Sequence, residues 1–155
     1  MNLRWAWERV RDWVRPLPEA ERAAAARWEA ARIADQDVAM CEAIGAHGLD
    51  LFRSLAEQRP SARQNEPFQV LTHCNAGWLA NVDWGTTLAP RYKAHRDGLS
   101  MQVWVGETRT RNQGASLTGN EWAREGVPKT RIGDNTGSPS RQHDPVDAGI
   151  DMPDR

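Results

Sequence analysis

Three short clusters hold the side chains that could do chemistry in this sequence. "HCNAG" at residues 73–77 places a cysteine directly after an apolar run. "ETRTRNQG" at residues 107–114 is basic and carries amides, and "GDNTG" at residues 133–137 adds a carboxylate. Cys74 is expected at the end of a strand and close to a helix that begins near Trp78, where a thiol is most easily activated. These residue types suit a polar ligand, but alone they do not name a reaction.

The segments around the clusters alternate between short apolar strands and helical stretches. "FQVLTH", "MQVWVG", "KTRI" and, more weakly, "VDAGI" are predicted strands, with helical segments at residues 83–98, 112–126 and 138–144. This alternation implies a parallel sheet with right-handed crossovers. Since parallel strands deliver their carboxyl-terminal loops to one edge, the three clusters should converge there. The predicted fold class is α/β, an N-terminal helical segment followed by a partial Rossmann-like parallel sheet in the order βαβαβαβ.

The first part of the chain is predicted to be helical. "LRWAWERVRDWV" repeats its apolar residues at helical spacing, and Pro16 and Pro18 end that helix. Residues 19–55 are rich in strong helix formers, but Gly45 and Gly48 weaken the run, so two helices are expected there. The polar stretch "EQRPSARQNEP" follows as a linker. We therefore expect a helical region at residues 1–58 and an α/β domain at residues 59–155, truncated at its C-terminus.

Composition excludes several classes of function. A chain of 155 residues normally makes one domain, and its net charge of −1 gives no pull toward nucleic acid or a membrane surface. No apolar run approaches the ~20 residues that span a bilayer. The 2 cysteines, Cys41 and Cys74, make no disulfide framework, so a reducing cytoplasm is the expected location. His73, His95 and His143 lack metal-ligand spacing, and no metal site is expected.

Each candidate residue also has a purely structural interpretation. Cys74 could be a small buried hydrophobe, as we expect for Cys41, and Asp134 with Asn135 could cap a helix. Arg109 and Arg111 could form a solvated loop surface. Four tryptophans at helical spacing favour packing over recognition: Trp5, Trp7, Trp13 and Trp28.

Taken in order, the motifs resemble a known family. "LTHCNAGWLA", "VWVGETRTRNQGASLTGNEW" and "IGDNTG" are similar to motifs of the S-methyl-5-thioribose-1-phosphate isomerases of methionine salvage. That family belongs with the regulatory subunits of the translation-initiation guanine-nucleotide exchange factor 2B. The opening "NLRWAWERVRDWVRPLP" also resembles the helical region of the family, so the likeness covers nearly the whole chain.

The resemblance implies an aldose–ketose isomerase that converts 5-methylthioribose 1-phosphate to 5-methylthioribulose 1-phosphate without a cofactor. It implies that the α/β domain is catalytic and that Cys74 and Asp134 are the catalytic pair. Gln113 matches the glutamine of the family's Arg-x-Gln-Gly loop and should contact substrate hydroxyls or phosphate. The remaining substrate-binding residues expected from the matched loops are Asn75, Gly77, Arg109 and Asn135. The expected partners are the sugar phosphate and, in the full-length family, a second copy in a homodimer.

An alternative within the same fold is a non-catalytic regulatory or oligomerisation module related to the exchange-factor subunits. Such a module has no reason to keep Cys74 and Asp134. A thiol-redox protein is less favoured, because Cys74 has no resolving partner at Cys-x-x-Cys spacing. The family also places an Arg-Gly-Ala-Pro segment before this region and an Asn-Lys pair after it. We therefore expect a fragment of the enzyme, with little or no turnover from residues 1–155 alone.

Overall fold

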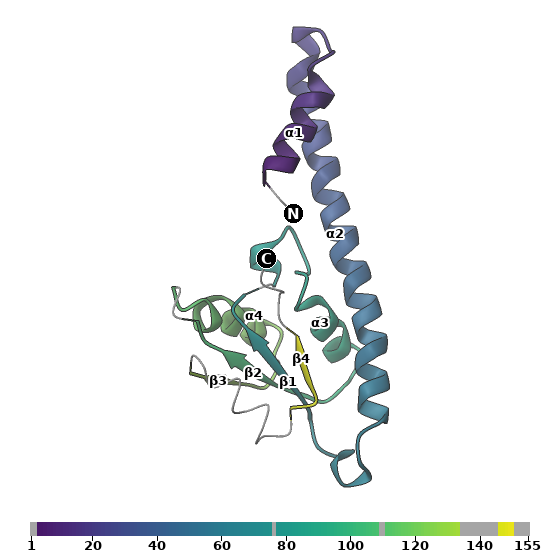
Figure 1. Ribbon diagram of the computed structural model, residues 1–155, viewed down its shortest axis with the longest axis vertical. Helices are drawn as coiled ribbons and strands as arrows, with labels where there is room; N and C mark the ends of the chain where they lie inside the picture. Colours follow the sequence, from purple (N-terminus) through teal and green to yellow (C-terminus); the bar gives the residue numbers. More distant parts are fainter. Residues whose placement is uncertain (1–2, 76, 109–110, 134–145, 151–155) are drawn as a thin grey trace. The chain divides into compact units, whose positions relative to one another are not determined.

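The computed structural model of the chain, shown in Figure 1, begins with two helices and continues with a parallel sheet and the shorter helices between its strands. The structure describes residues 3–75, 77–108, 111–133 and 146–150. It divides into two compact units, residues 1–40 and residues 41–155, and the division falls within the second helix. None of the helices in the described residues is long and apolar enough to cross a membrane.

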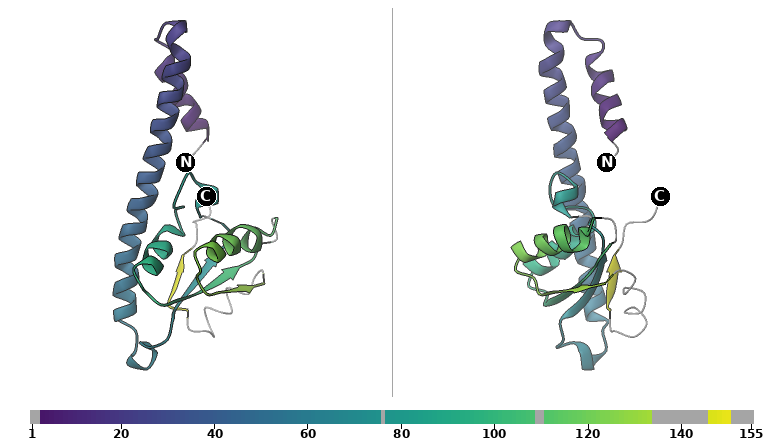
Figure 2. Two further views of the ribbon diagram at one scale, coloured as in Figure 1. Left: turned by 180° about the vertical axis from the view of Figure 1, so that it is seen from behind. Right: turned by 90° about the vertical axis from the view of Figure 1, so that its left-hand side faces the viewer.

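Helix α1 (Leu3–Val14) confirms the predicted first helix, and α2 (Glu19–Glu57) follows after the proline-containing turn. No residue of α1 is buried. The predicted packing role of the tryptophans is met only in part: Trp13 and Trp28 stack with ring centroids 5.6 Å apart, yet both stay about half exposed. The two helices, best separated in the right-hand view of Figure 2, are therefore joined by partly exposed contacts.

The expectation of two helices over residues 19–55 is wrong, because α2 runs unbroken from Glu19 to Glu57. The two glycines that suggested a break serve packing instead. A Cβ added at Gly48 would overlap the ring of Pro90, and one at Gly45 would lie 3.0 Å from Lys93 Cδ. A glycine in a helix interior costs about 0.5–1 kcal/mol relative to alanine. Here the absence of side chains at the two glycines lets the helix that contains Pro90 and Lys93 approach α2 closely.

Within the described residues the sheet has four strands, β1 (Phe68–His73), β2 (Met101–Gly106), β3 (Lys129–Ile132) and β4 (Ala148–Ile150). Their spatial order is β3-β2-β1-β4, and every neighbouring pair is parallel. The predicted α/β class and all four strand segments are thereby confirmed. Asp147 fixes the entry to β4, because its carboxylate accepts the backbone N–H of Gln69 at 2.7 Å and pairs with Arg63 at 3.0 Å.

The connections between strands differ in one place from the prediction. A single 3₁₀ turn, η2 (Trp78–Ala80), stands where an α-helix was expected to begin, and α3 (Ala89–Arg96) starts only later. The intervening loop turns at Trp84 and Gly85, which both have positive φ, a conformation that no helix can contain. After β2 come a π-helical turn, η3 (Gly114–Thr118), and α4 (Gly119–Arg124). The helix predicted at residues 138–144 lies outside the described residues.

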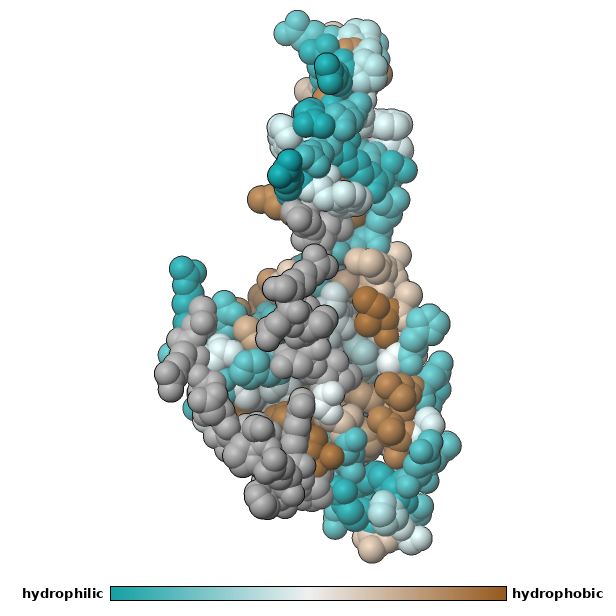
Figure 3. All heavy atoms as spheres, in the orientation of Figure 1, coloured by the Kyte–Doolittle hydropathy of each residue, from teal (hydrophilic) through white to brown (hydrophobic). Residues whose placement is uncertain are grey.

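The apolar core of the second unit lies on one face of the sheet. Because register aligns Phe68 with Met101 and side chains alternate along a strand, Phe68, Val70, Met101, Val103 and Val105 share that face. The end of α2 covers it through Phe52, and α3 and α4 cover it through Tyr92 and Trp122. On the side seen in Figure 3, apolar residues gather over this unit, while the helical unit is mostly hydrophilic.

Candidate active site

Cys74 follows directly after β1, at the carboxyl edge of the parallel sheet. Its backbone has φ of 57°, a left-handed conformation that costs a non-glycine residue of order 1–3 kcal/mol and is enriched at functional sites. The side chain is partly exposed, and its Sγ donates a hydrogen bond to Oε1 of Gln113 at 3.2 Å. Two predicted site residues from separate loops are therefore in contact. Cys41, in contrast, is fully buried, as expected.

The loop that carries Cys74 is held by side chains from the segment after β2. Thr118 Oγ1 donates to the carbonyl of Cys74 at 2.6 Å and accepts from Asn75 Nδ2 at 3.0 Å. The same Asn75 Nδ2 donates to Glu121 at 2.9 Å. Gly77 packs directly on the Glu121 carboxylate, and a Cβ added there would overlap it. Asn75 and Gly77, predicted to bind substrate, therefore have Thr118 and Glu121 as their contacts in this structure.

The loop that carries Gln113 is held by Glu107, the first residue after β2. Its carboxylate accepts the backbone N–H groups of Thr108 at 2.9 Å, Gly114 at 3.0 Å and Ala115 at 3.0 Å. Arg111 and Asn112 both have positive φ, 59° and 51°, so the chain turns sharply just before Gln113. These restraints present the Gln113 amide at the N-terminal end of η3, facing the thiol.

Glu121, like Thr118 and Glu107, is a polar residue near this edge that the sequence analysis did not single out. It is fully buried, and it also accepts the hydroxyl of Tyr92 at 2.5 Å. Burial, and then this hydrogen bond, raise the pKa of Tyr92 far above its ordinary value. The one available signal was the helical spacing of Thr118 and Glu121, which places both on the side facing the cysteine loop.

Three predicted site residues, Arg109, Asp134 and Asn135, lie outside the described residues. Within the described residues, the carboxyl edge of the sheet therefore presents the thiol of Cys74 and the side-chain amide of Gln113. No titratable side chain among these residues is hydrogen-bonded to the Cys74 thiol. No group of three or more histidine, cysteine or carboxylate side chains in the described part of the chain is arranged to hold a metal ion.

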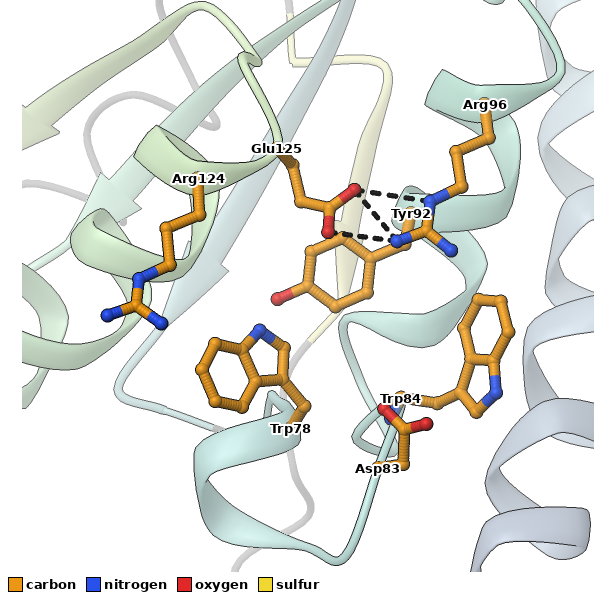
Figure 4. Close-up of a pocket in the computed structure, with 7 residues that line it drawn as sticks. All are labelled: Trp78, Asp83, Trp84, Tyr92, Arg96, Arg124 and Glu125. Atoms are coloured by element: carbon orange, nitrogen blue, oxygen red, sulfur yellow. Dashed lines mark hydrogen bonds and ion pairs between the residues drawn. The ribbon is translucent and has the colours of Figure 1, made fainter.

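A separate pocket of about 290 Å³ lies beside this edge, shown in Figure 4. Its aromatic lining is Trp78, Trp84 and Tyr92, and Arg96 and Glu125 form an ion pair at 2.9 Å across it. Trp78 belongs to both places, since its backbone N–H donates to Glu121 at 3.2 Å while its side chain lines the pocket. Trp78 therefore connects the pocket to the loop that carries Cys74.

Comparisons with known proteins identify relatives of this chain. A methylthioribose-1-phosphate isomerase of Rhodospirillum rubrum is 53% identical over the whole chain, and one of Escherichia coli is 48% identical. The chain spans 40% and 41% of their respective lengths.

Among solved structures, 5-methylthioribose 1-phosphate isomerase of Pyrococcus horikoshii matches all of this chain and 41% of its own, with a TM-score of 0.78 and 34% identity. The translation initiation factor eIF-2B subunit delta of A. fulgidus matches 96% of this chain and 40% of its own, with a TM-score of 0.75 and 33% identity. The model of the initiation factor 2 subunit family covers residues 1–139. The chain therefore belongs to the initiation factor 2 subunit family.

Proposed function

We propose that this chain carries the central part of an isomerase site that converts 5-methylthioribose 1-phosphate to 5-methylthioribulose 1-phosphate in methionine salvage. The observation that supports it best is the contact between Cys74 and Gln113 at the carboxyl edge of the sheet. The relatives at 48–53% identity carry the name of this activity. Because the chain spans only about 40% of their length, the activity of the whole protein is part of the proposal.

The proposed chemistry needs proton transfers and no redox cofactor. The phosphate on C1 keeps the sugar ring closed, so the ring oxygen must leave C1 and take up a proton. The hydrogen on C2 then moves to C1, and the C2 hydroxyl loses its proton as the ketone forms, so protons and electrons balance within the substrate. We assign these acid and base roles to Cys74 and Asp134. Gln113 would bind substrate hydroxyls or phosphate, with Arg109 and Asn135 as further contacts.

Asn75 and Gly77 receive a narrower role than the sequence suggested. The amide nitrogen of Asn75 already donates to Thr118 and Glu121, and Gly77 leaves room only for the Glu121 carboxylate. We propose that both shape the substrate site through the backbone of the cysteine loop. Their substitution should therefore change the position of Cys74 before it changes any direct contact with substrate.

A chimera tests the assignment of Cys74. Residues 1–155 replace the matching segment of the Rhodospirillum rubrum relative, and turnover of 5-methylthioribose 1-phosphate is measured. Cys74→Ser should reduce kcat by at least ~10²-fold, the usual scale for a lost acid or base. Cys41→Ala is the matched control, because Cys41 is buried and has no proposed role. Turnover near that of the parent chimera in Cys74→Ser would rule out the catalytic role.

A single substitution distinguishes the proposed catalytic role of Asp134 from a role in helix capping. Asp134→Asn keeps the ability to cap a helix, because both residues cap well, but removes the titratable group. We expect stability to stay unchanged and kcat in the chimera to fall by ~10²-fold or more. Unchanged kcat would leave capping as the whole role of Asp134.

The alternative function, a non-catalytic regulatory or oligomerisation module, draws its support from the likeness to the eIF-2B subunit delta of A. fulgidus. The chimera distinguishes the two, since a regulatory module predicts no turnover in any variant.

We further propose that the protein works as a homodimer in the cytoplasm. Cys41 and Cys74 are both thiols, which suits a reducing compartment, and light scattering during gel filtration tests the dimer.

A further inference from the structure

Glu121 is placed to control where Cys74 stands, although it does not touch the thiol. We propose that Glu121 is a positioning residue, which holds the described part of the cysteine loop (residues 74–75 and 77–79) so that Cys74 keeps its left-handed backbone and its contact with Gln113. This inference rests on the proposed function for the importance of Cys74. The role of Glu121 itself follows from four hydrogen bonds and one close packing contact.

The first observation is that, within the described residues, the hydrogen bonds to the Glu121 carboxylate come from donors in or beside that loop. Oε1 accepts from Asn75 Nδ2 at 2.9 Å and from the N–H of Leu79 at 3.4 Å. Oε2 accepts from the N–H of Trp78 at 3.2 Å and from the hydroxyl of Tyr92 at 2.5 Å. Three of the four donors belong to the cysteine loop, and the group is fully buried. Bonds to a buried charged acceptor are the strong ones.

The second observation is the shape of the loop where it meets Glu121. Gly77 lies against the carboxylate so closely that no larger residue fits without displacing one of the two. The loop therefore reaches its place only with glycine at this position and an acceptor behind it. Thr118, one helical turn before Glu121, holds the carbonyl of Cys74 from the same side. The two side chains together restrain both ends of the turn.

The third observation is that Cys74 needs such a restraint. With φ of 57° the residue sits in a region that non-glycine residues leave unless their surroundings hold them there. Without Glu121, Asn75 and two backbone N–H groups would lose an acceptor, and the turn could relax to an ordinary conformation. Its thiol would then leave Gln113 and become more accessible to solvent.

Alkylation of the two cysteines in the purified chain tests the proposal. Iodoacetamide should label Cys74 about tenfold faster in Glu121→Gln than in the parent chain, since one lost acceptor shifts local opening by about that factor. Buried Cys41 serves as an internal reporter of global unfolding and should keep its rate. Glu125→Gln is the matched control, because Glu125 lies on the same segment and pairs with Arg96 instead. Equal Cys74 rates in Glu121→Gln and Glu125→Gln would overturn the proposal, as would parallel rises at Cys74 and Cys41.

A milder variant decides the question if Glu121→Gln unfolds the chain. Tyr92→Phe removes one donor and keeps the ring, which packs on Trp122 with centroids 4.8 Å apart. It leaves the three loop donors on Glu121, so Cys74 labelling should rise by less than about threefold, the scale of a weak hydrogen bond. Adding Asn75→Ala to Tyr92→Phe should raise it further, with Cys41 unchanged. No rise in the double variant would overturn the proposal. Labelling is measured without substrate, so a failed isomerase assignment would leave these rates unaffected.

Discussion

The two units of this protein each bury a glutamate, and they satisfy it in opposite ways. In the helical unit, Glu29 is fully buried and accepts from Arg9 at 2.6 Å and from Arg32 at 2.8 Å. In the α/β unit, Glu121 is equally buried, and in the described residues its four hydrogen bonds come from neutral donors. The carboxyl group of Glu29 is therefore paired with two guanidinium groups, whereas that of Glu121 is held by neutral donors.

This difference shows where the stability of each unit comes from. Arg32 covers the rings of Trp13 and Trp28, at 5.7 and 5.3 Å, so the helix pair is held by cation–π and ion-pair contacts at half-exposed sites. Such contacts at partly exposed sites are individually weak and weaken further in salt. The α/β unit instead packs Trp122, Tyr92 and its strand valines without exposure to water. We therefore expect the free energy of unfolding of the α/β unit to be higher than that of the helical unit.

The largest difference should appear when one tryptophan is deleted from each unit. Trp122→Ala removes a fully buried ring and should lower the free energy of unfolding by about 3–5 kcal/mol. Trp28→Ala removes a ring that is 56% exposed and should cost about 0.5–1.5 kcal/mol, the worth of an aromatic pair. Urea denaturation followed by circular dichroism measures both. Similar costs at the two positions would show that burial does not separate the units.

The second prediction concerns the close contact between α2 and α3. Gly48→Ala puts a methyl group into the ring of Pro90, and overpacking of this kind costs about 1–3 kcal/mol. Gly45→Ala is the matched control, because its methyl group meets mainly the flexible end of Lys93 and gains about 0.5–1 kcal/mol of helix propensity. The midpoint of urea unfolding should fall for Gly48→Ala alone. A stabilising Gly48→Ala would mean that α3 does not approach α2 as closely as described.

A smaller effect is expected from alkaline pH in the α/β unit. Burial, and then the hydrogen bond to Glu121, raise the pKa of Tyr92 in the folded state above its unfolded value of 10.0. Its contribution to stability is therefore complete below pH 10.0 and is lost as the pH rises above it. Because the chain has 1 tyrosine, tyrosinate absorbance reports this residue alone and should appear only when the unit unfolds. In Tyr92→Phe this alkaline loss of stability should be absent. Titration of Tyr92 near its ordinary pKa in the folded chain would contradict its burial.

The smallest effect belongs to the helical unit and to acid. The hydrogen bond from Arg32 first, and then that from Arg9, lower the pKa of Glu29 below its ordinary value of 4.5. The stability that Glu29 provides is present above pH 4.5 and is lost as the pH falls below it. The exciton circular-dichroism signal of stacked Trp13 and Trp28 should fade over this range and lose its pH dependence in Glu29→Gln. Gln36→Ala, which leaves the carboxylate in place, is the control. An unchanged acid profile in Glu29→Gln would remove Glu29 as its cause.

Much of the fold could be predicted because its signals are local. The strand segments at residues 68–73, 101–106 and 129–132 show short apolar patterns between turns, and the α/β alternation follows from them. Gly126 is the last residue of the helical segment predicted at residues 112–126, and in the structure it follows α4 with φ of 71°. The two glycines of α2 misled the prediction because their role depends on α3, which is remote in the sequence. Local patterns do not reveal a close approach between distant segments.

The site divides in the same way. The meeting of the loops that carry Cys74 and Gln113 could be predicted because parallel topology delivers strand-end loops to one edge. The family resemblance then singled out these two residues, and the structure places them in contact. Glu121, Thr118 and Glu107 could not be found in this way, since their roles lie in hydrogen bonds to backbone groups of other loops. Asn75 is the clearest example of what residue type alone does not reveal. An asparagine suits contact with a ligand, but here its side-chain amide donates hydrogen bonds to Thr118 and Glu121.

The π-helical turn η3 determines how far apart in the sequence the two side chains that contact Cys74 can lie. Its i→i+5 bonding pattern returns Gln113 and Thr118 to nearly the same side, whereas an α-helix of 3.6 residues per turn would point them apart. One side chain then reaches the thiol of Cys74 and the other its carbonyl. A regular α-helix brings residues four apart, and not five apart, onto one face. The wider π-helical turn is therefore what lets two side chains five residues apart reach the same cysteine residue.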